Sequence, residues 1–268
     1  MNNQKPSTKS AATPLGLRPK LLEMRSIAKV FAEDVVALSD MSLTVNVGDF
    51  ISLLGPSGCG KSTALRLIAD LIHPTTGRIA WSETEHNHTI SVVFQEPTLM
   101  PWATVGENVW LPFRLASRSY RSCRDEIMEA LRLVSLENFE KSYPRELSGG
   151  MKMRTSIARA LITHPSIMLM DEPFAALDEI NRFKLNHDLL QLKEKIGCTV
   201  IFVTHSVFES VFLSDRIVVM AARPGRVHRE LTIEQPYPRS DSFRTSAEYS
   251  AYCRTASEAL QEAMGETN

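Results

Sequence analysis

The fold of this chain is decided by Gly55-Pro56-Ser57-Gly58-Cys59-Gly60-Lys61-Ser62-Thr63. This stretch follows the apolar run Phe50-Ile51-Ser52-Leu53-Leu54 and precedes a helical pattern that begins at Ala64. Its spacing matches G-x-x-x-x-G-K-[ST]. In that motif, glycines let backbone N–H groups close around phosphate oxygens, and the following helix adds its unpaired donors and dipole. The sequence therefore predicts a strand, a phosphate-binding loop and a helix.

Two side chains of this loop have specific roles in such a motif. Lys61 is expected to reach the β- and γ-phosphates of a nucleoside triphosphate, and Ser62 to ligate Mg²⁺. The alternative is a glycine-rich turn that only packs a helix on a sheet, and the strand-loop-helix context disfavours it. We therefore expect a nucleoside triphosphate site in which all nine loop residues bind the nucleotide.

The composition is that of an ordinary globular chain. Its 268 residues are 43% hydrophobic, and its 30 basic and 31 acidic residues nearly cancel. No global basic field therefore favours nucleic acid, although the sum would hide a local patch, and no nucleic-acid partner is expected. The four cysteines lack C-x-x-C spacing, which fits free thiols in a reducing compartment such as the cytoplasm. They are Cys59, Cys123, Cys198 and Cys253.

No stretch of the sequence resembles a membrane anchor. The longest apolar runs are far shorter than the ~18 residues that a membrane helix needs. Residues 1–20 are polar and contain prolines, without the apolar block of a signal peptide. Contact with a membrane would therefore come through a partner.

Composition and pattern divide the chain into three regions. Residues 1–19 are expected to form a disordered tail, because they cannot bury enough apolar surface. A main domain is expected over residues 20–235, with an inserted, mostly helical subdomain at about residues 105–165. Residues 236–268 form a C-terminal extension in which apolar residues recur at three- and four-residue intervals, which predicts an amphipathic helix. These residues are Tyr249, Tyr252, Ala256, Leu260 and Met264.

The first part of the domain has the pattern of antiparallel β-structure. Residues 41–45 alternate apolar and polar side chains before Gly48-Asp49, which predicts a hairpin turn into the strand before the phosphate loop. Residues 78–81 and 89–94 have the pattern of two strands separated by a polar tip. Phe31 ends the first strand, where its ring could either stack on a purine or belong to the core.

Acidic residues end a second buried strand. The apolar run of residues 167–170 leads into Asp171-Glu172-Pro173, where the proline stops strand pairing. Beside a phosphate loop, Asp171 would hold Mg²⁺ and Glu172 would orient and polarise the attacking water. The strand of residues 198–203 is followed by His205, which would lie at the same edge if the sheet is parallel. We therefore consider His205 a candidate phosphate contact.

A second possible anion site begins another helix. Leu147-Ser148-Gly149-Gly150 precedes a helical pattern over residues 151–161. A serine hydroxyl and exposed backbone N–H groups at a helix start can bind an anion. From these residues alone, a simple helix cap is an equally good interpretation.

Taken together, these motifs resemble the ATP-binding subunit of ABC transporters over residues 21–232. The matching segments are the phosphate loop, Gln95 for the Q-loop, residues 147–150 for the signature, residues 167–172 for the Walker B strand, Asp178 for the D-loop and His205 for the switch histidine. The resemblance implies an α/β fold. Its P-loop NTPase core has a mostly parallel sheet, and an antiparallel β edge subdomain and an inserted helical signature subdomain are added to it.

The resemblance also implies a homodimer that binds ATP and Mg²⁺. In this family two subunits pair head to tail, so that Ser148, Gly149 and Gly150 of one would close on the γ-phosphate held by the other. Phe31 would stack on adenine and Asp178 would lie near the nucleotide. Lys61, Gln95, Glu172 and His205 would be the catalytic residues, and Ser62, Gln95 and Asp171 the metal ligands.

Finer features resemble one importer group within the family. Residues 94–102, 170–174 and 223–226 look like those of nitrate, sulfonate and taurine importers, a group that includes transporters of thiamine-related pyrimidines. This implies a membrane permease as partner, an indirect role for a periplasmic solute-binding protein, and a peripheral place on the cytoplasmic face of the inner membrane.

The alternative is a soluble ABC ATPase that acts on nucleic acid or the ribosome. Such proteins usually carry paired nucleotide domains or a long coiled-coil insertion, and this sequence has neither. Three positions depart from the family pattern: Met153 replaces a usual Gln, Ser206 a usual Asp, and Ala175-Ala176 a frequent Gly or Ser. None of these changes removes a phosphate, metal or base group, so activity is expected to be retained.

Overall fold

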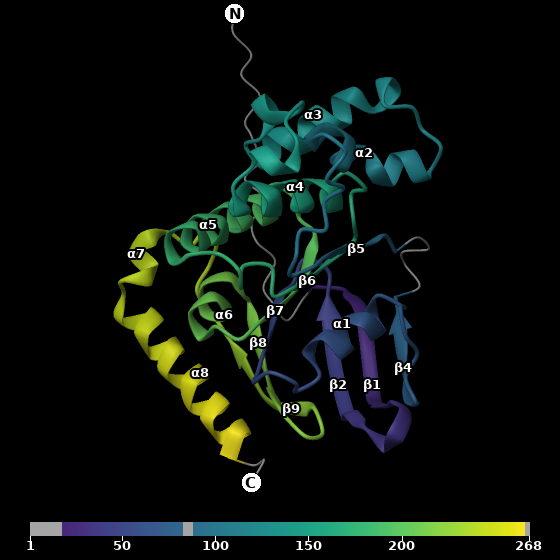
Figure 1. The fold of residues 1–268 in the computed structure, drawn as a ribbon. Helices are drawn as coiled ribbons and strands as arrows, with labels where there is room; N and C mark the ends of the chain where they lie inside the picture. The colour runs from purple at the N-terminus through teal and green to yellow at the C-terminus, as the bar shows by residue number, and fades with distance from the viewer. Residues whose placement is uncertain (1–17, 83–87, 266–268) are drawn as a thin grey trace, which may run out of the picture.

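The computed structural model describes residues 18–82 and 88–265. At its centre is a six-stranded sheet in the order β5-β6-β7-β3-β8-β9 (Figure 1). All neighbours in this sheet are parallel except β8 and β9. This confirms the mostly parallel core. The strands are β3 (Phe50–Leu54), β5 (Ile90–Val93), β6 (Ile167–Asp171), β7 (Thr199–Thr204), β8 (Arg216–Ala221) and β9 (Arg226–Thr232).

A second, antiparallel sheet has the order β2-β1-β4. Its strands are β1 (Lys20–Val30), β2 (Val36–Asn46) and β4 (Thr76–Trp81), and a short 3₁₀ turn at Ala32–Asp34 joins the first two. The hairpin expected at Gly48-Asp49 is therefore wrong, because β2 and β3 belong to different sheets. The strands on either side of the polar tip are likewise divided between the sheets, and residues 83–87 of that tip lie outside the described residues. A turn signal marks a reversal of the chain but does not identify the strand's pairing partner.

Different elements pack on the two faces of the large sheet. Side chains of β3 alternate: Ile51 and Leu53 face α1 (Lys61–Ile68) and the small sheet, while Phe50 and Leu54 face the other way. Strand residues alternate in this way because successive side chains point to opposite faces. The helices after β5 cover the face that carries Phe50 and Leu54. Helix α1 covers the opposite face and is enclosed between the two sheets.

The inserted segment is helical, as expected. Its helices lie together at one end of the molecule (Figure 1). They are α2 (Val105–Leu115), α3 (Arg124–Leu133) and α4 (Gly149–Leu161), with 3₁₀ turns at Arg121–Cys123, Glu137–Phe139 and Pro144–Glu146. The start of α2 is set by a capping box, in which the Thr104 hydroxyl accepts from the Glu107 N–H and the Glu107 carboxylate accepts from the Thr104 N–H.

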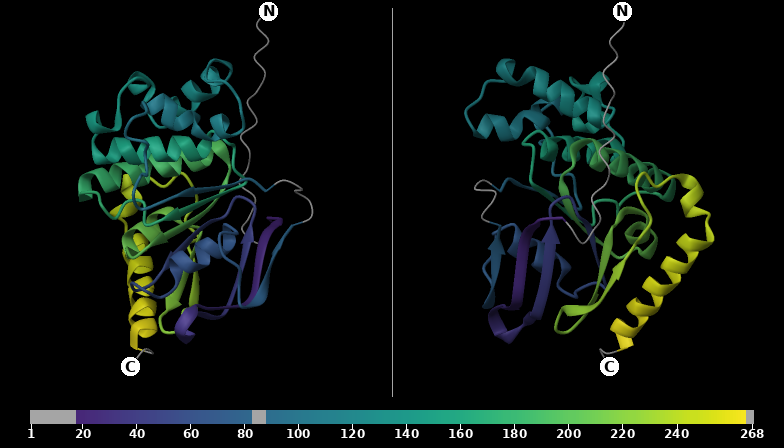
Figure 2. Two further views of the ribbon diagram at one scale, coloured as in Figure 1. Left: turned by 45° about the vertical axis from the view of Figure 1, so that its right-hand side comes forward. Right: turned by 180° about the vertical axis from the view of Figure 1, so that it is seen from behind.

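The C-terminal helices pack on the large sheet. After α5 (Glu179–Ile196) and α6 (Val207–Leu213), a short helix α7 (Asp241–Arg244) leads into α8 (Ala247–Gly265), which runs along the outside of the molecule (Figure 2). Helix α8 contacts β8 and α6, and the small side chains of Ala256, Ala259 and Ala263 are buried there. Met264 is expected on the buried face of α8, but this prediction is wrong, because its side chain is 53% exposed. The buried face carries alanines instead, whose small side chains let α8 approach β8 closely. None of the described helices is both long and apolar enough to cross a membrane.

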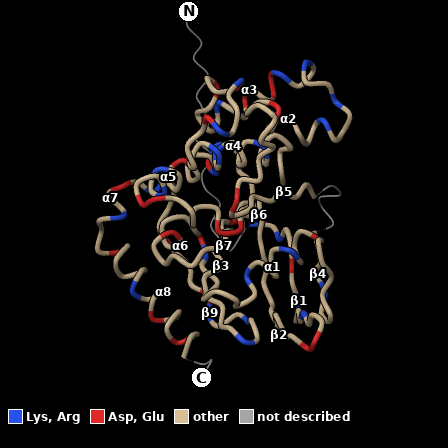
Figure 3. Tube along the Cα trace, viewed as in Figure 1, with Lys and Arg blue, Asp and Glu red and all other residues tan. Residues whose placement is uncertain are grey.

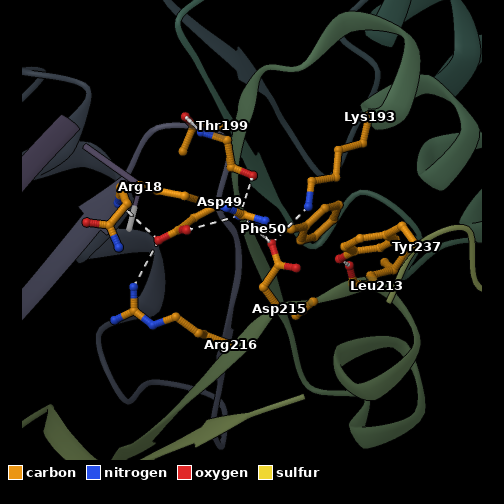
Figure 4. Close-up of polar contacts among 12 residues, drawn as sticks. Arg18, Asp49, Phe50, Lys193, Thr199, Leu213, Asp215, Arg216 and Tyr237 are labelled. Carbon is orange, nitrogen blue, oxygen red and sulfur yellow. Dashed lines mark hydrogen bonds and ion pairs between the residues drawn. The ribbon is translucent and has the colours of Figure 1, made fainter. Parts of the chain in front are cut away.

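Buried ion pairs hold the amino ends of the central strands (Figure 4). Asp49 lies before β3 and accepts from Arg18 and Arg216, at 3.3 and 3.0 Å. Asp215 lies before β8 and accepts from Lys193 and from the Phe50 N–H, both at 2.9 Å. The contacts of the domain therefore include Arg18, two residues before the boundary expected from composition. Residues 1–17 of the expected tail lie outside the described residues.

We expect Asp215→Asn to lower the free energy of unfolding by about 3 kcal/mol, because it leaves the Lys193 ammonium buried without its counter-charge. Burial alone would raise the pKa of Asp215, but Lys193 and the Phe50 N–H lower it below its ordinary value. A lowered folded-state pKa means that this stabilisation is complete at neutral pH and is lost as the pH falls below about 4. Urea denaturation at pH 7 and at lower pH measures both effects. Glu129→Gln, at an exposed site on α3, is the control, and an equal loss in both variants would contradict the assignment.

Candidate functional site

The phosphate loop joins β3 to α1 in the predicted order. Gly60 caps α1 with a φ of +89°. A Cβ there would lie 2.6 Å from Leu38 Cδ2 and 2.9 Å from the Ala37 carbonyl. Only glycine combines this left-handed backbone with so close an approach to β2. The close packing leaves the first turn of α1, with its unpaired N–H groups, directed at the space above the loop.

A pocket of about 490 Å³ opens above this loop. Its walls come from the loop residues Ser57 to Thr63 without Cys59, from Phe31 and residues 35–37, and from Glu172 and Arg223. The motif did not reveal residues 35–37 or Arg223 as pocket residues, because they are brought here only by the packing of β2 and of the turn after β8. A proline-glycine turn follows Arg223, which is a sequence signal for a loop but not for a site.

Three residues of the motif do not line the pocket. Gly55 and Pro56 supply carbonyl groups that accept from Lys61 Nζ, at 2.8 and 2.9 Å. Cys59 is fully buried beneath the loop, and its N–H donates to the Pro56 carbonyl. Burial raises the pKa of the Cys59 thiol, which keeps it protonated. These residues shape the loop from below.

Lys61 and two carboxylates meet at the carboxyl ends of β3 and β6. Lys61 Nζ lies 3.9 Å from Glu172 Oε1, and Ser62 Oγ donates to Asp171 Oδ1 at 3.0 Å. Burial raises the pKa of Asp171, while the bond from Ser62 lowers it in part. A cation, two carboxylates and a hydroxyl thus lie beside the phosphate loop, where the sequence analysis expected them. Figure 3 shows acidic segments in this central part of the molecule, and basic and acidic residues interspersed elsewhere.

His205 lies beside Glu172. Its Nδ1 is 3.5 Å from Glu172 Oε2, and it follows β7 at the same edge as the carboxylates. Glu172 has a φ of +45°, a left-handed conformation that costs energy for a side chain with a Cβ, and its N–H donates to the Val203 carbonyl. Backbone strain of this kind is concentrated at functional sites.

Phe31 lines the pocket above the phosphate loop, whereas Gln95 does not. Gln95 is exposed, two residues after β5, and is not among the residues that line the pocket. Phe31 does line it, and its ring is 41% exposed with Lys29 Nζ 5.1 Å from the ring centroid. Phe31 is therefore no core residue, which leaves its ring available for stacking.

The signature residues lie apart from this pocket. Ser148 caps α4 by accepting from the Met151 N–H. A Cβ on Gly149 would be 3.4 Å from its nearest neighbour outside α4, and one on Gly150 would be 3.8 Å away, so the packing of this chain leaves room for a side chain at either position. Asp178 caps α5, and bonds from the Asn181 backbone and side chain lower its pKa. None of these four residues lines the pocket of the phosphate loop.

The three positions that depart from the family pattern lie outside the pocket above the phosphate loop. Met153 is buried in the large core cluster. Ser206 caps α6, since its hydroxyl accepts from the Glu209 N–H. Ala175 and Ala176 lie in the loop between β6 and α5, and Ala176 is exposed. None of them contacts Lys61, Asp171 or Glu172 through a bond of its side chain.

Comparison of the sequence with known proteins identifies its family. The family model described as ABC transporter matches residues 38–175. The aliphatic sulfonates import ATP-binding protein SsuB of Bacillus cereus is 40% identical over 233 residues, which cover 85% of this chain and 92% of that protein. The uncharacterized ABC transporter ATP-binding protein MJ0412 of Methanocaldococcus jannaschii is 44% identical over 86% of this chain and 88% of that protein.

Solved structures show the same fold. The dimeric ATP-binding cassette MJ0796 in a post-hydrolysis state, bound to ADP and Pi, is similar with a TM-score of 0.68 and 32% identity, over 81% of this chain and all of that one. The fold of cbiO1 from Clostridium perfringens is also similar, with a TM-score of 0.73 at 23% identity, over 85% of this chain and 94% of that one. With its phosphate loop, Walker B carboxylates and helical insertion, the chain belongs to the ATP-binding subunits of ABC transporters, which bind and hydrolyse ATP.

Proposed function

We propose that this chain powers the import of an aliphatic sulfonate through a membrane permease, as a homodimer that binds two ATP and Mg²⁺. The dimer is supported by the separation of two helix starts that can bind an anion, those of α1 and α4. The α1 end has a pocket of its own, whereas the α4 end carries two glycines that the packing of this chain does not require. A second copy, paired head to tail, would give both glycines a ligand, namely the γ-phosphate held by the other copy's loop.

The chemistry of hydrolysis rests on side chains around the loop. Lys61 would neutralise charge on the β- and γ-phosphates, and Glu172 would accept a proton from the attacking water. His205, beside Glu172, would donate to the γ-phosphate. Phe31 would stack on adenine at the open end of the pocket. Catalysis of this kind is positioning and charge stabilisation by groups already in place.

The donor set fits Mg²⁺. Ser62 Oγ and Asp171 Oδ1 lie 3.0 Å apart, and Mg²⁺ in proteins is bound by one or two carboxylates together with phosphate oxygens and water. Ser62, Asp171 and, after movement of its exposed side chain, Gln95 would hold the ion. When bound, it would neutralise charge that develops on the phosphates.

An exposed aromatic residue supports contact with a permease. The segment after β5 is bounded by Pro97 and Pro101, and the Trp102 side chain that follows is 75% exposed. A large apolar side chain exposed to this degree favours a protein partner. The chain would then be a peripheral protein on the cytoplasmic face of the membrane, and a solute-binding protein on the other side would deliver the cargo.

The sulfonate assignment is supported by the relative of that name and is tested by growth. In the source organism, deletion of this chain should abolish growth on an alkanesulfonate as sole sulfur source and leave growth on sulfate unchanged. Restoring the wild-type chain should rescue growth, and Lys61→Ala should fail to do so. Normal growth of the deletion strain on alkanesulfonates would reject the cargo, but not the ATPase activity.

We expect Glu172→Gln to bind ATP with wild-type affinity but to lower turnover by about a hundredfold or more, because the amide cannot accept the proton from water. Phosphate release measures turnover, and isothermal titration measures nucleotide affinity. Glu129→Gln serves again as the neutral control. Turnover within a few-fold of wild type would mean that another group is the base.

Mixing two inactive variants tests the head-to-tail dimer. Ser148→Arg blocks the signature end and Lys61→Ala removes the phosphate ligand, so each homodimer should be inactive. In the mixed dimer, the intact Lys61 of the Ser148→Arg chain pairs with the intact signature of the Lys61→Ala chain. One of the two sites is thereby restored. Random pairing should therefore recover at most about a quarter of wild-type hydrolysis. Absence of any recovery, with both variants folded, would argue against sites shared between two copies.

A further inference from the structure

A second pocket lies between α5, α6 and the C-terminal segment. Its volume is about 490 Å³, and it shares no residue with the pocket above the phosphate loop. Helix α5 contributes Arg182, Phe183 and Asn186, helix α6 contributes Phe208, and the C-terminal helices contribute Arg244 and Tyr249. The hydrolysis of ATP described above uses none of these side chains.

Asn186 is the most deeply buried polar residue that lines this pocket. It is only 1% exposed, yet neither its Oδ1 nor its Nδ2 has a hydrogen-bond partner among the described residues. A buried amide without partners is costly, and such groups in folded proteins almost always bond to protein, water or ligand. The Asn186 side chain is therefore available to bind a ligand in this pocket.

The two arginines add further unused donors. Arg244 Nη2 and Arg182 Nε are buried and have no hydrogen bond in the described part of the chain. The Arg244 guanidinium lies over the Phe212 ring, 3.6 Å from its centroid, which fixes its orientation. Together with Asn186 Nδ2, these are three buried donors without a hydrogen bond, against one such acceptor among the pocket residues, Asn186 Oδ1. This imbalance favours a ligand that accepts hydrogen bonds, and the Arg244 guanidinium favours an anion.

The nearest buried carboxylate is already engaged. Glu209 accepts from the Thr204 hydroxyl at 2.5 Å, and its Oε1 lies 3.6 Å from Arg182 Nε. Burial raises the pKa of Glu209. Glu179 also borders the pocket, but it is exposed in the first turn of α5, where water screens its charge. Arg182 and Glu209 therefore form an ion pair at the pocket, and the Arg244 guanidinium supplies a further positive charge.

Aromatic rings form the remaining walls. Phe183 and Phe208 are exposed at 43% and 61%, large values for phenylalanine. The Tyr249 hydroxyl already donates to the Phe208 carbonyl, so its ring is the part left for contact. Rings of this kind bury an apolar body beside a small number of polar groups.

We propose that this pocket binds a small amphipathic oxyanion, a carboxylate or sulfonate on an apolar body, and that the ligand regulates ATP hydrolysis through α6. Ser206 borders the pocket and directly follows His205. It caps α6, while its own N–H donates to the Thr204 hydroxyl that binds Glu209. A ligand against Ser206 and Arg182 therefore contacts the segment that positions His205. The site does not depend on which solute is transported.

The direct test is isothermal titration of the full chain, without and with saturating ATP·Mg²⁺, using hexanesulfonate as probe. We expect hexanesulfonate to bind in both conditions. Hexylammonium, with the same body and opposite charge, should not bind, and inorganic sulfate should bind more weakly than hexanesulfonate. The proposal fails if hexylammonium binds equally well, if hexanesulfonate does not bind, or if ATP displaces it, since the last result would place it at the phosphate loop.

Variants locate the binding. Asn186→Leu and Arg244→Leu should each weaken hexanesulfonate binding by about tenfold or more, because each removes a donor to the anion. Arg254→Leu, at an exposed position of α8, is the matched control and should bind as wild type. If a buried substitution prevents folding, Phe208→Asp at the exposed rim should weaken binding by charge repulsion. Wild-type affinity in the folded variants would overturn the site.

The regulatory part has its own readout. Saturating hexanesulfonate should change the rate of ATP hydrolysis in the wild-type chain and leave it unchanged in Asn186→Leu. An unchanged rate in the wild type, with binding confirmed, would reject regulation through α6. Hydrolysis without hexanesulfonate is measured in the same assay, so failure of this inference is distinguished from failure of the ATPase assignment.

Discussion

Two backbone hydrogen bonds between Gly225 and β2 join the two sheets beside the phosphate loop. The Gly225 N–H donates to the Ala37 carbonyl, and the Ser39 N–H donates to the Gly225 carbonyl, at 3.1 and 2.9 Å. They tie the turn between β8 and β9 in the large sheet to the edge of the small sheet. A Cβ on Gly225 would lie 2.2 Å from the Cys59 carbonyl, so this contact has no room for any other residue. The nucleotide pocket exists because the two sheets meet here.

The amino and carboxyl ends of the strands in the large sheet carry acidic residues in different environments. At the amino ends, Asp49 and Asp215 are buried and fully engaged by cations and backbone N–H groups. At the carboxyl ends, Glu172 is partly buried, His205 is exposed, and their side chains contact each other at 3.5 Å. A buried carboxylate with strong partners stabilises the fold, whereas a partly exposed one can change its partner during a reaction. The parallel arrangement of the strands makes this division possible.

The C-terminal segment packs against α6, the helix that follows His205. Arg244 packs on Phe183 of α5 and Phe212 of α6, and Arg239 is fully buried with bonds to carbonyl groups of α6 and the residue after it. Residues 236–265 are thus part of the packed structure, and α6 lies between His205 and α8. This position connects the second pocket to the sheet edge that carries Glu172 and His205.

Local motifs could be predicted from the sequence because their geometry depends on neighbouring residues. The glycines and Lys61 of the phosphate loop, the acidic pair at the end of β6 and the cap at Ser148 are all short-range features of backbone and side chain. The position of His205 at the edge that carries the carboxylates also follows from its sequence, on the condition that the sheet is parallel. These features are the ones that the family resemblance shares.

Other features depend on contacts between residues far apart in the chain, and only the tertiary structure decided them. The strands on either side of Gly48 belong to different sheets because each buries its apolar face against α1. Met264 is exposed because alanines let α8 approach β8 on another face. Arg18, Arg223 and the pocket around Asn186 have no local signature, since their roles come from packing partners that lie tens to hundreds of residues away.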